Sequence, residues 1–164
     1  MRFSIETMTP DDWPEVLAIY EAGMATGVGT FEVAVPAWEE WDRARLPHSR
    51  LVARAQGVIG WAALSPASQR ACYAGVAEAA VYVAPAARGH GVGRALLDAL
   101  VASAEANGIW TLQGVTIATN RPSLALQESC GFRVVGRRER IAKRDGVWHD
   151  TVLTERRSRR VGVD

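Results

Sequence analysis

The chain has 164 residues, of which 48% are hydrophobic and 23% are charged, and its formal net charge at pH 7 is +1. This length and balance predict one globular domain that buries a full core without disulfides or a bound metal. Its two cysteines, Cys72 and Cys130, are too few for a disulfide scaffold and too far apart for a CxxC zinc or redox site. We therefore expect a reducing, cytoplasmic location.

Neither a membrane nor a nucleic acid is an expected partner. No apolar run approaches the roughly 18 residues that a membrane helix needs, and the first residues do not resemble a signal peptide. Positive charge gathers in residues 156–164, which hold four Arg and one Asp, so residues 1–155 carry a small net negative charge. A nucleic-acid-binding domain carries its positive charge on the folded body. We predict a domain over residues 1–155 and a disordered Arg-rich tail over 156–164.

The first half of the chain predicts two helices and then three strands. Thr9-Pro10-Asp11-Asp12 is typical of a helix start, and apolar residues follow it at helical spacing until the glycines at 23, 27 and 29. A short second helix begins near Pro36. Residues 51–54 and 58–64 predict a hairpin, and residues 78–83 predict a strand that ends before Pro85.

The second half alternates helices and strands. Apolar spacing predicts a helix that ends at Gly108, a strand over 111–117 and a short helix from about Pro122 to Cys130. Residues 132–135 and 148–153 predict closing strands on either side of an Asp145-Gly146 turn, with the intervening basic residues on a solvated hairpin face. This order predicts the α/β (α+β) class: a single domain with a mixed, mostly antiparallel sheet flanked by helices.

Residues 81–94 contain a strand, a loop with three glycines and the start of a helix. Glycine lets main-chain N–H groups face a ligand, and a helix N-terminus adds a positive dipole, so the pattern favours a phosphate or pyrophosphate. A dinucleotide fingerprint would need glycine where Arg94 stands, and a P-loop would need Gly-Lys-Ser/Thr. The alternative is a glycine-rich turn that binds nothing.

This stretch resembles a known family. Arg88-Gly-His-Gly-Val-Gly93 is similar to the (R/Q)xxGx(G/A) signature of the GCN5-related N-acetyltransferases, in which the loop holds the pyrophosphate of acetyl-coenzyme A. Asn120-Arg-Pro-Ser123 running on to Gly131-Phe132 resembles the downstream motif of that superfamily. Residues 30–32, 70–73, 78–83 and 146–150 resemble, in order, segments of the phosphinothricin and methionine-sulfone acetyltransferases, which act on small L-amino acids and their analogues. The likeness covers about residues 2 to 155.

The resemblance implies an N-acetyltransferase with acetyl-coenzyme A as co-substrate and no metal. It implies direct attack by the acceptor amine in a ternary complex, and a homodimer, which six tryptophans would suit. Main-chain N–H groups of the 81–83 strand would meet the negative oxygen of the reacting carbonyl. Asn120 would bind the pantetheine arm, cap its helix, or do both. The expected coenzyme-binding residues are Val81, Tyr82, Val83, Arg88, Gly89, His90, Gly91, Val92, Gly93, Arg94 and Asn120.

Glu78 is the candidate general base. An acceptor amine must lose a proton before it attacks, and Glu78 begins a strand otherwise made of Ala, Val and Tyr, where poor hydration makes a carboxylate a stronger base. The alternative is that Glu78 is a solvated glutamate at the end of a strand and has no catalytic role. The resemblance favours the role of general base, which would act through a water molecule. At the position where the superfamily commonly supplies a tyrosine acid stands Gln127, which cannot donate a catalytic proton. Cys72 and Tyr73 are weak candidates for the acid.

An acceptor carboxylate should meet a cation. Arg70 is the residue that we expect there, because a guanidinium binds a carboxylate with two prongs and the family has a substrate-side arginine at the matching position. Phe31 and Tyr73 would wall the acceptor pocket, with Trp148 and His149 closing it, although each is also compatible with plain packing. One histidine beside an aspartate makes no metal site.

Two other functions are compatible with the sequence. The acceptor could be a protein N-terminus, a lysine or a polyamine, although a polyamine site should be rich in acids, against which Arg70 argues. Outside catalysis, the chain could be an acyl-coenzyme A sensor or a nucleic-acid-associated module that uses its Arg tail.

Overall fold

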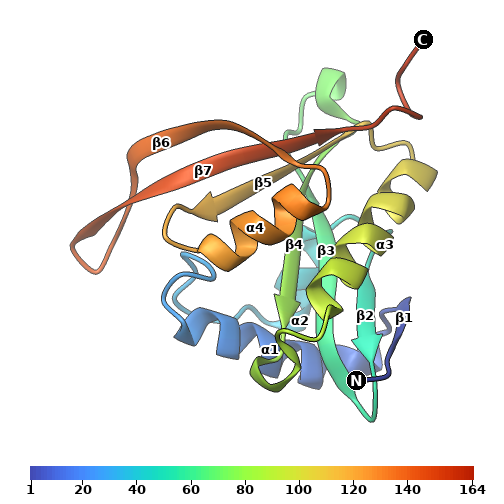
Figure 1. The fold of residues 1–164 in the computed structure, drawn as a ribbon, viewed down its shortest axis with the longest axis vertical. Helices are drawn as coiled ribbons and strands as arrows, with labels where there is room; N and C mark the ends of the chain where they lie inside the picture. The colour runs from blue at the N-terminus through green and yellow to red at the C-terminus, as the bar shows by residue number, and fades with distance from the viewer.

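The computed structural model describes all of residues 1–164, which form seven strands in one sheet and four helices (Figure 1). The strands are β1 (Ser4–Thr7), β2 (Leu51–Arg54), β3 (Val58–Pro66), β4 (Val76–Val83), β5 (Thr111–Ile117), β6 (Arg133–Arg144) and β7 (Val147–Arg157). The helices are α1 (Trp13–Ala25), α2 (Trp38–Ala44), α3 (Val92–Ala106) and α4 (Arg121–Ser129). Short 3-10 turns, η1 (Pro10–Asp12), η2 (Ala71–Tyr73) and η3 (Pro85–Ala87), precede α1, β4 and α3.

The sheet order is β1-β2-β3-β4-β5-β7-β6, and every neighbouring pair is antiparallel except β4 with β5. This confirms the mixed, mostly antiparallel sheet that the sequence predicts. The prediction omitted β1, because its four residues contain one apolar side chain and carry no alternating pattern. It also shortened the last two strands, which run to the Asp145-Gly146 turn, where both residues have positive φ.

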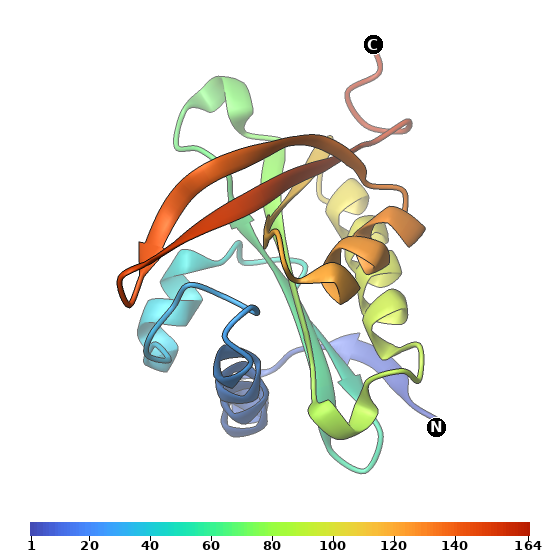
Figure 2. The same cartoon turned by 60° about the vertical axis from the view of Figure 1, so that its left-hand side comes forward.

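Helices cover both faces of the sheet, as the turned view shows (Figure 2). On one face, α3 buries Leu96, Leu97 and Leu100 against β2, β3 and β4. On the other, α1 buries a helical stripe made of Val16, Ile19 and Tyr20. Its start is fixed as expected, because the Asp12 carboxylate accepts from the N–H of Thr9 at 2.9 Å.

Four of the six tryptophans belong to the core beneath α1 and α2. Trp13, Trp38, Trp41 and Trp61 pack ring against ring with centroids 5.5–5.7 Å apart. Trp41 and Trp61 are fully buried. Their burial removes the tryptophan argument for a dimer, because these rings already stabilise the single chain.

The C-terminal segment corrects the expected domain boundary. β7 continues through Arg157, and Ser158 is buried, with its hydroxyl donating to the Glu105 carboxylate at 2.9 Å. Arg156 pairs with the same carboxylate at 3.1 Å. The first residues of the predicted tail are therefore ordered, because β7 needs them to complete its pairing with β5.

β4 and β5 separate after three pairs of residues. Their parallel pairing runs from Val76 with Thr111 to Glu78 with Gln113 and stops there. Beyond that point β4 stays paired with β3 up to Val83, while β5 stays paired with β7 up to Ile117. The two strands diverge visibly in Figure 1, and the sheet opens between them.

Candidate active site

The opening between β4 and β5 forms a cavity of about 990 Å³. Its walls are the separated parts of β4 and β5, the glycine loop with the start of α3, α4, the loop of residues 26–32 and the end of α2. A cavity of this size can hold a long ligand and a small second molecule together. Most of the residues that the sequence singled out meet here.

The glycine loop forms one end of this cavity. Gly89 and Gly91 have φ of 77° and 80°, and a side chain added at either would meet no protein atom within 4 Å. The first intrahelical bond of α3 runs from the N–H of Ala95 to the carbonyl of Gly91 at 3.0 Å, so the N–H groups of the preceding turn have no helical partner. No acidic residue lies in that first turn. The end is therefore built to receive an anion.

The Arg and His side chains of the loop differ in whether they line the cavity. Arg88 and Arg94 both line the cavity, and Arg88 also donates from Nε to the carbonyl of Val83 at 3.3 Å. His90 does not line the cavity, because its ring turns back to hydrogen-bond the carbonyl of Arg88 at 2.9 Å. The structure thus places every residue from 88 to 94 at this end except His90.

The wall formed by β4 exposes its main chain to the cavity. The N–H of Ala84 donates to Ile59 at 2.9 Å, which fixes the alternation: even-numbered residues of β4 bond to β3. The main-chain groups of Val81 and Val83 therefore face the opening, where β5 no longer pairs with them. The ring of Tyr82 lies on the α1 side, and burial raises its pKa to about 12.

Glu78 lies at the point where β4 and β5 part. It is the last residue of β4 that pairs with β5, it is half-buried, and it lines the cavity. Its carboxylate makes no hydrogen bond or ion pair within the chain. A carboxylate in this position is free to take a proton from a ligand.

Gln127 ties three elements together. Its Nε2 donates to the hydroxyls of Thr116 on β5 (2.8 Å) and Ser123 on α4 (3.1 Å), and its Oε1 accepts from Thr154 on β7 (2.5 Å). The amide is thus engaged by protein partners on both of its atoms. This closed network fits a positioning role for Gln127.

Three side chains hold the loop of residues 26–32 over the cavity. Asn120 caps α4 by accepting from the N–H of Ser123 at 3.3 Å, and it donates from Nδ2 to the carbonyl of Val28 at 3.1 Å. Tyr82 donates to the carbonyl of Gly29 at 3.2 Å. Arg144 donates to the carbonyls of Thr30 and Gly27.

The contacts of Arg144 correct its expected position and help to place Phe31. The sequence placed this arginine on a solvated hairpin face, whereas it is largely buried against the loop and lies over the Phe31 ring at 5.9 Å. Phe31 lines the cavity as expected. His149 packs edge-on behind Phe31, with ring centroids 5.6 Å apart, and does not itself reach the cavity.

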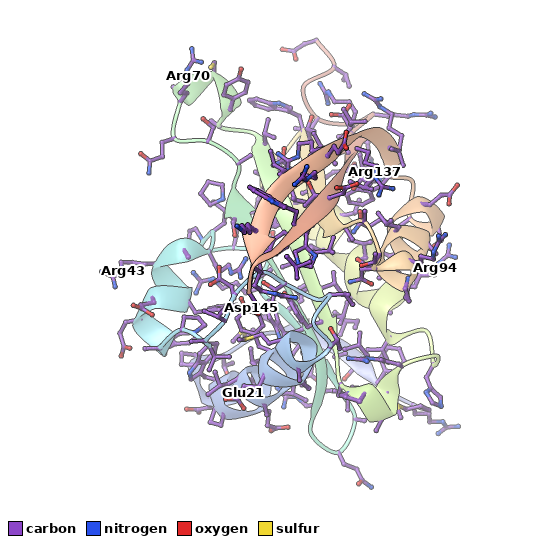
Figure 3. The ribbon with its side chains drawn as sticks, turned by 90° about the vertical axis from the view of Figure 1, so that its left-hand side faces the viewer. Glu21, Arg43, Arg70, Arg94, Arg137 and Asp145 are labelled. Atoms are coloured by element: carbon purple, nitrogen blue, oxygen red, sulfur yellow. The ribbon has the colours of Figure 1, made fainter.

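Arg70, Tyr73 and Trp148 lie outside the cavity. Arg70 is exposed beside η2, stacks on Tyr73 at 5.7 Å and projects away from the site (Figure 3). The turn that carries it precedes β4 at the closed end of the opening, where the carbonyl of Gly75 bonds to residues 110 and 111. Trp148 is 47% exposed and lies beneath Arg140 and Lys143. Cys72, like Tyr73, is exposed outside the cavity, so neither weak acid candidate is near the site.

Arg45 is the site residue that the sequence analysis missed. It follows α2, lines the cavity near Glu78, and donates from Nη1 to the Ser65 hydroxyl at 2.7 Å. Sequence reasoning chose Arg70 because a guanidinium suits a carboxylate and because the family resemblance has a substrate-side arginine at that position. The signal for Arg45 was available only in the fold, which brings the end of α2 to β3 and β4.

Known proteins share both this fold and this sequence. Residues 13–132 match the model of the acetyltransferase (GNAT) family. A phosphinothricin N-acetyltransferase from Alcaligenes faecalis is 36% identical, over 93% of this chain and 81% of its own. An L-methionine sulfoximine/L-methionine sulfone acetyltransferase from Pseudomonas aeruginosa is 29% identical over 94% of both chains.

A solved structure extends the likeness to three dimensions. The GNAT phosphinothricin acetyltransferase from Sinorhizobium meliloti, in complex with acetyl-coenzyme A, superposes with a TM-score of 0.90 at 26% identity. That match covers 100% of this chain and 92% of the other. The chain belongs to the GNAT family of acetyltransferases and is an acetyl-coenzyme A-dependent N-acetyltransferase.

Two further features of the fold bear on ligands and membranes. No three His, Cys, Asp or Glu side chains gather where they could hold a metal ion. None of the helices combines the length and the apolar character that spanning a bilayer requires.

Proposed function

We propose that this enzyme moves an acetyl group from acetyl-coenzyme A to the α-amino group of a small L-amino acid or analogue of the phosphinothricin or methionine sulfone type. The observation that carries the proposal is the single cavity onto which the α3 N-terminus, the unpaired edge of β4 and Glu78 all open. The relatives named for these acceptors match nearly the whole chain.

The residues at the glycine end fit coenzyme A. Gly89 and Gly91 leave the main chain open to the cavity, and the first turn of α3 offers N–H groups that suit a pyrophosphate. Arg88 and Arg94 stand beside it to pair with phosphates. When bound, acetyl-coenzyme A supplies the acetyl group as an activated thioester.

In the proposed acetyl transfer, groups along β4 act on both reactants. Glu78 takes a proton from the acceptor ammonium, directly or through a water, and the freed amine attacks the acetyl carbon. The main-chain N–H of Val81 or Val83 donates to the carbonyl oxygen as negative charge develops there. As the carbon–sulfur bond breaks, the coenzyme leaves as its thiolate and the attacking nitrogen gives its second proton to water. Water then protonates the thiolate, so the reaction proceeds without an acid at position 127.

Thiol release in the presence of acetyl-coenzyme A and a panel of acceptors tests this proposal. We expect turnover with L-methionine sulfone and phosphinothricin and little with peptides, polyamines or lysine side chains. Turnover restricted to peptides would show that the acceptor is a peptide or protein amine and not a free amino acid. Coenzyme A binding without turnover on any amine would favour a sensor.

We also propose that the enzyme works as a homodimer in the cytoplasm. Five large apolar side chains on the β6–β7 hairpin are 44–64% exposed: Val134, Val135, Ile141, Val147 and Trp148. The hairpin extends beyond the helical layers (Figure 2), where a second copy could cover it. Light scattering should give twice the 17.8 kDa chain mass, and Val147→Lys should lower it. A wild-type monomer would refute the dimer.

A further inference from the structure

Arg45 is a half-buried cation, with a buried Nε, that the chain leaves without an acidic partner. No carboxylate lies within ion-pair distance of it, although the protein contains eight ion pairs elsewhere. The one hydrogen bond of its guanidinium is to Ser65, and the guanidinium lies over the rings of Trp41 (5.6 Å) and Trp61 (5.8 Å). The neighbouring Arg50 lies over the same Trp41 ring at 5.5 Å but pairs with Asp42.

Unsatisfied donors gather around this guanidinium. Three buried side-chain polar atoms in the chain lack a hydrogen-bond partner, and all belong to one cluster: Nε of Arg45 and Nε1 of Trp41 and Trp61. A buried donor without an acceptor is costly, and a buried charge without a partner is more so. Of these three residues only Arg45 lines the cavity, so an acceptor from outside the chain can reach its guanidinium, whereas the two indole N–H groups lie in the core.

The surroundings of Arg45 specify the charge of that acceptor. Burial lowers the pKa of Arg45, and the hydroxyls of Tyr20 and Tyr82 and the carboxylates of Glu78 and Glu32 are the groups that oppose this change. None of them is an ion-pair partner, so a negative group brought by a ligand would relieve the cost of the buried charge. A polyamine would meet repulsion at this position.

We infer that Arg45 binds the α-carboxylate of the acceptor, an assignment that rests on the proposed function. Ser65, which accepts from Arg45, pairs directly with Glu78 across β3 and β4. Directly paired residues have side chains about 5 Å apart on one face of a sheet. The cation and the proposed base are therefore neighbours, as an α-amino acid requires, since its carboxylate and amino group share one carbon.

This assignment sets the specificity of the site. A free amino acid presents a carboxylate beside its amine, whereas a peptide N-terminus presents an uncharged amide there. Arg45 would therefore select free amino acids. Arg70, exposed at the closed end of the opening, is not needed for this contact.

Binding of L-methionine sulfone and of its α-amide to the coenzyme A-saturated protein tests the inference by calorimetry. The sulfone side chain is uncharged, so the α-carboxylate is the only anion that differs between the two ligands. We expect wild type to bind the acid about 10- to 100-fold more tightly, the range of a charged hydrogen-bonded pair. Arg45→Gln should bind both ligands equally weakly. The exposed Arg43→Gln, from the helix that Arg45 follows, should behave as wild type.

Two further measurements make the test independent of folding. Arg45→Gln should bind coenzyme A as wild type does. Should Arg45→Gln fail to fold, Arg45→Lys keeps the charge and the stem on the tryptophans, and it should retain only part of the preference because an ammonium lacks the two-pronged contact. Equal binding of acid and amide by wild type, no binding of either, an undiminished preference in the folded Arg45 variants, or loss of the preference in Arg70→Gln would overturn the inference.

Thiol release separates this inference from the proposed function. If the sulfone binds through Arg45 but no thiol is released, the inference stands and the proposed function fails. If thiol is released and Arg45→Gln keeps the preference for the acid, the proposed function stands and the inference fails.

Discussion

The two ends of the cavity are built from different materials. The proposed coenzyme end lies within residues 81–94, where main-chain groups of Val81, Val83 and the glycine loop face the opening because two glycines have positive φ and β5 has separated from β4. The proposed acceptor end consists of side chains from separate elements, chiefly Phe31, Arg45 and Glu78. A function carried by consecutive main-chain atoms leaves a motif in the sequence, whereas one carried by converging side chains does not.

The comparison predicts different losses at the two ends, and the largest belongs to Glu78. Glu78→Gln should lower kcat about 100- to 1000-fold, because an amide cannot take the proton of the acceptor. Affinity for coenzyme A should be unchanged, because Glu78 lies away from the glycine loop. Glu21→Gln, on the exposed side of α1 (Figure 3), should keep full activity. Wild-type turnover by Glu78→Gln would show that water alone serves as the base.

At the other end, Gly91→Val should weaken coenzyme A binding by about 10- to 100-fold, a loss of about 1.4–2.8 kcal/mol. Its added side chain would contact no protein atom and would occupy the space proposed for the coenzyme A phosphates. Gly108→Val is the matched control, with φ of 79° against 80° and equally open surroundings at the far end of α3. Both should lose about 1–3 kcal/mol of unfolding free energy. Equal loss of coenzyme affinity in both would mean that backbone strain alone is responsible.

Gln127 lies between the ends and should behave as a positioning residue. Gln127→Leu should lower the unfolding free energy by about 2 kcal/mol, because the hydroxyls of Thr116 and Thr154 lose their partner. Its kcat should fall less than tenfold, with an unchanged pH profile. Glu128→Leu, exposed and one residue further on, controls for leucine on α4. A stable Gln127→Leu protein as inactive as Glu78→Gln would instead give this amide a direct part in the reaction.

The smallest effect concerns the α1 side of β4 at alkaline pH. The pKa of Tyr82 is raised to about 12 in the folded protein, against an ordinary value of 10.0, so the folded state holds this proton more tightly. The resulting stability is complete below pH 10 and is lost as pH rises towards 12. Tyr82→Phe should remove about 1–2 kcal/mol of that pH dependence in denaturant titrations, and the exposed Tyr73→Phe should not. Parallel curves for wild type and Tyr82→Phe would contradict the assignment.

The sequence predicted most of the fold because its signals are local. The Thr9 cap, the apolar stripe of α1, the glycine loop and the Asp145-Gly146 turn each specify their element from a few adjacent residues. β1 lacks such a signal and was missed. The ordered end of β7 was missed because an Arg-rich composition does not reveal that these residues pair with β5.

The candidate site divides in the same way. Residues of the glycine loop other than His90 line the cavity together, since their spacing is set by the chain itself. Arg70 was chosen as the carboxylate-binding arginine from its chemistry and the family resemblance, and it lies outside this chain's own cavity. Arg45 reaches Ser65 only because α2 packs its tryptophans on β3. That contact depends on tertiary packing, which no spacing rule encodes.

A crystal structure of the enzyme with coenzyme A and L-methionine sulfone would test the account most directly. We predict the pyrophosphate against the main-chain amides of residues 89–94, the acceptor amine next to Glu78 and the carboxylate on Arg45. A coenzyme bound outside the opening between β4 and β5, or an acceptor held away from Glu78, would contradict it.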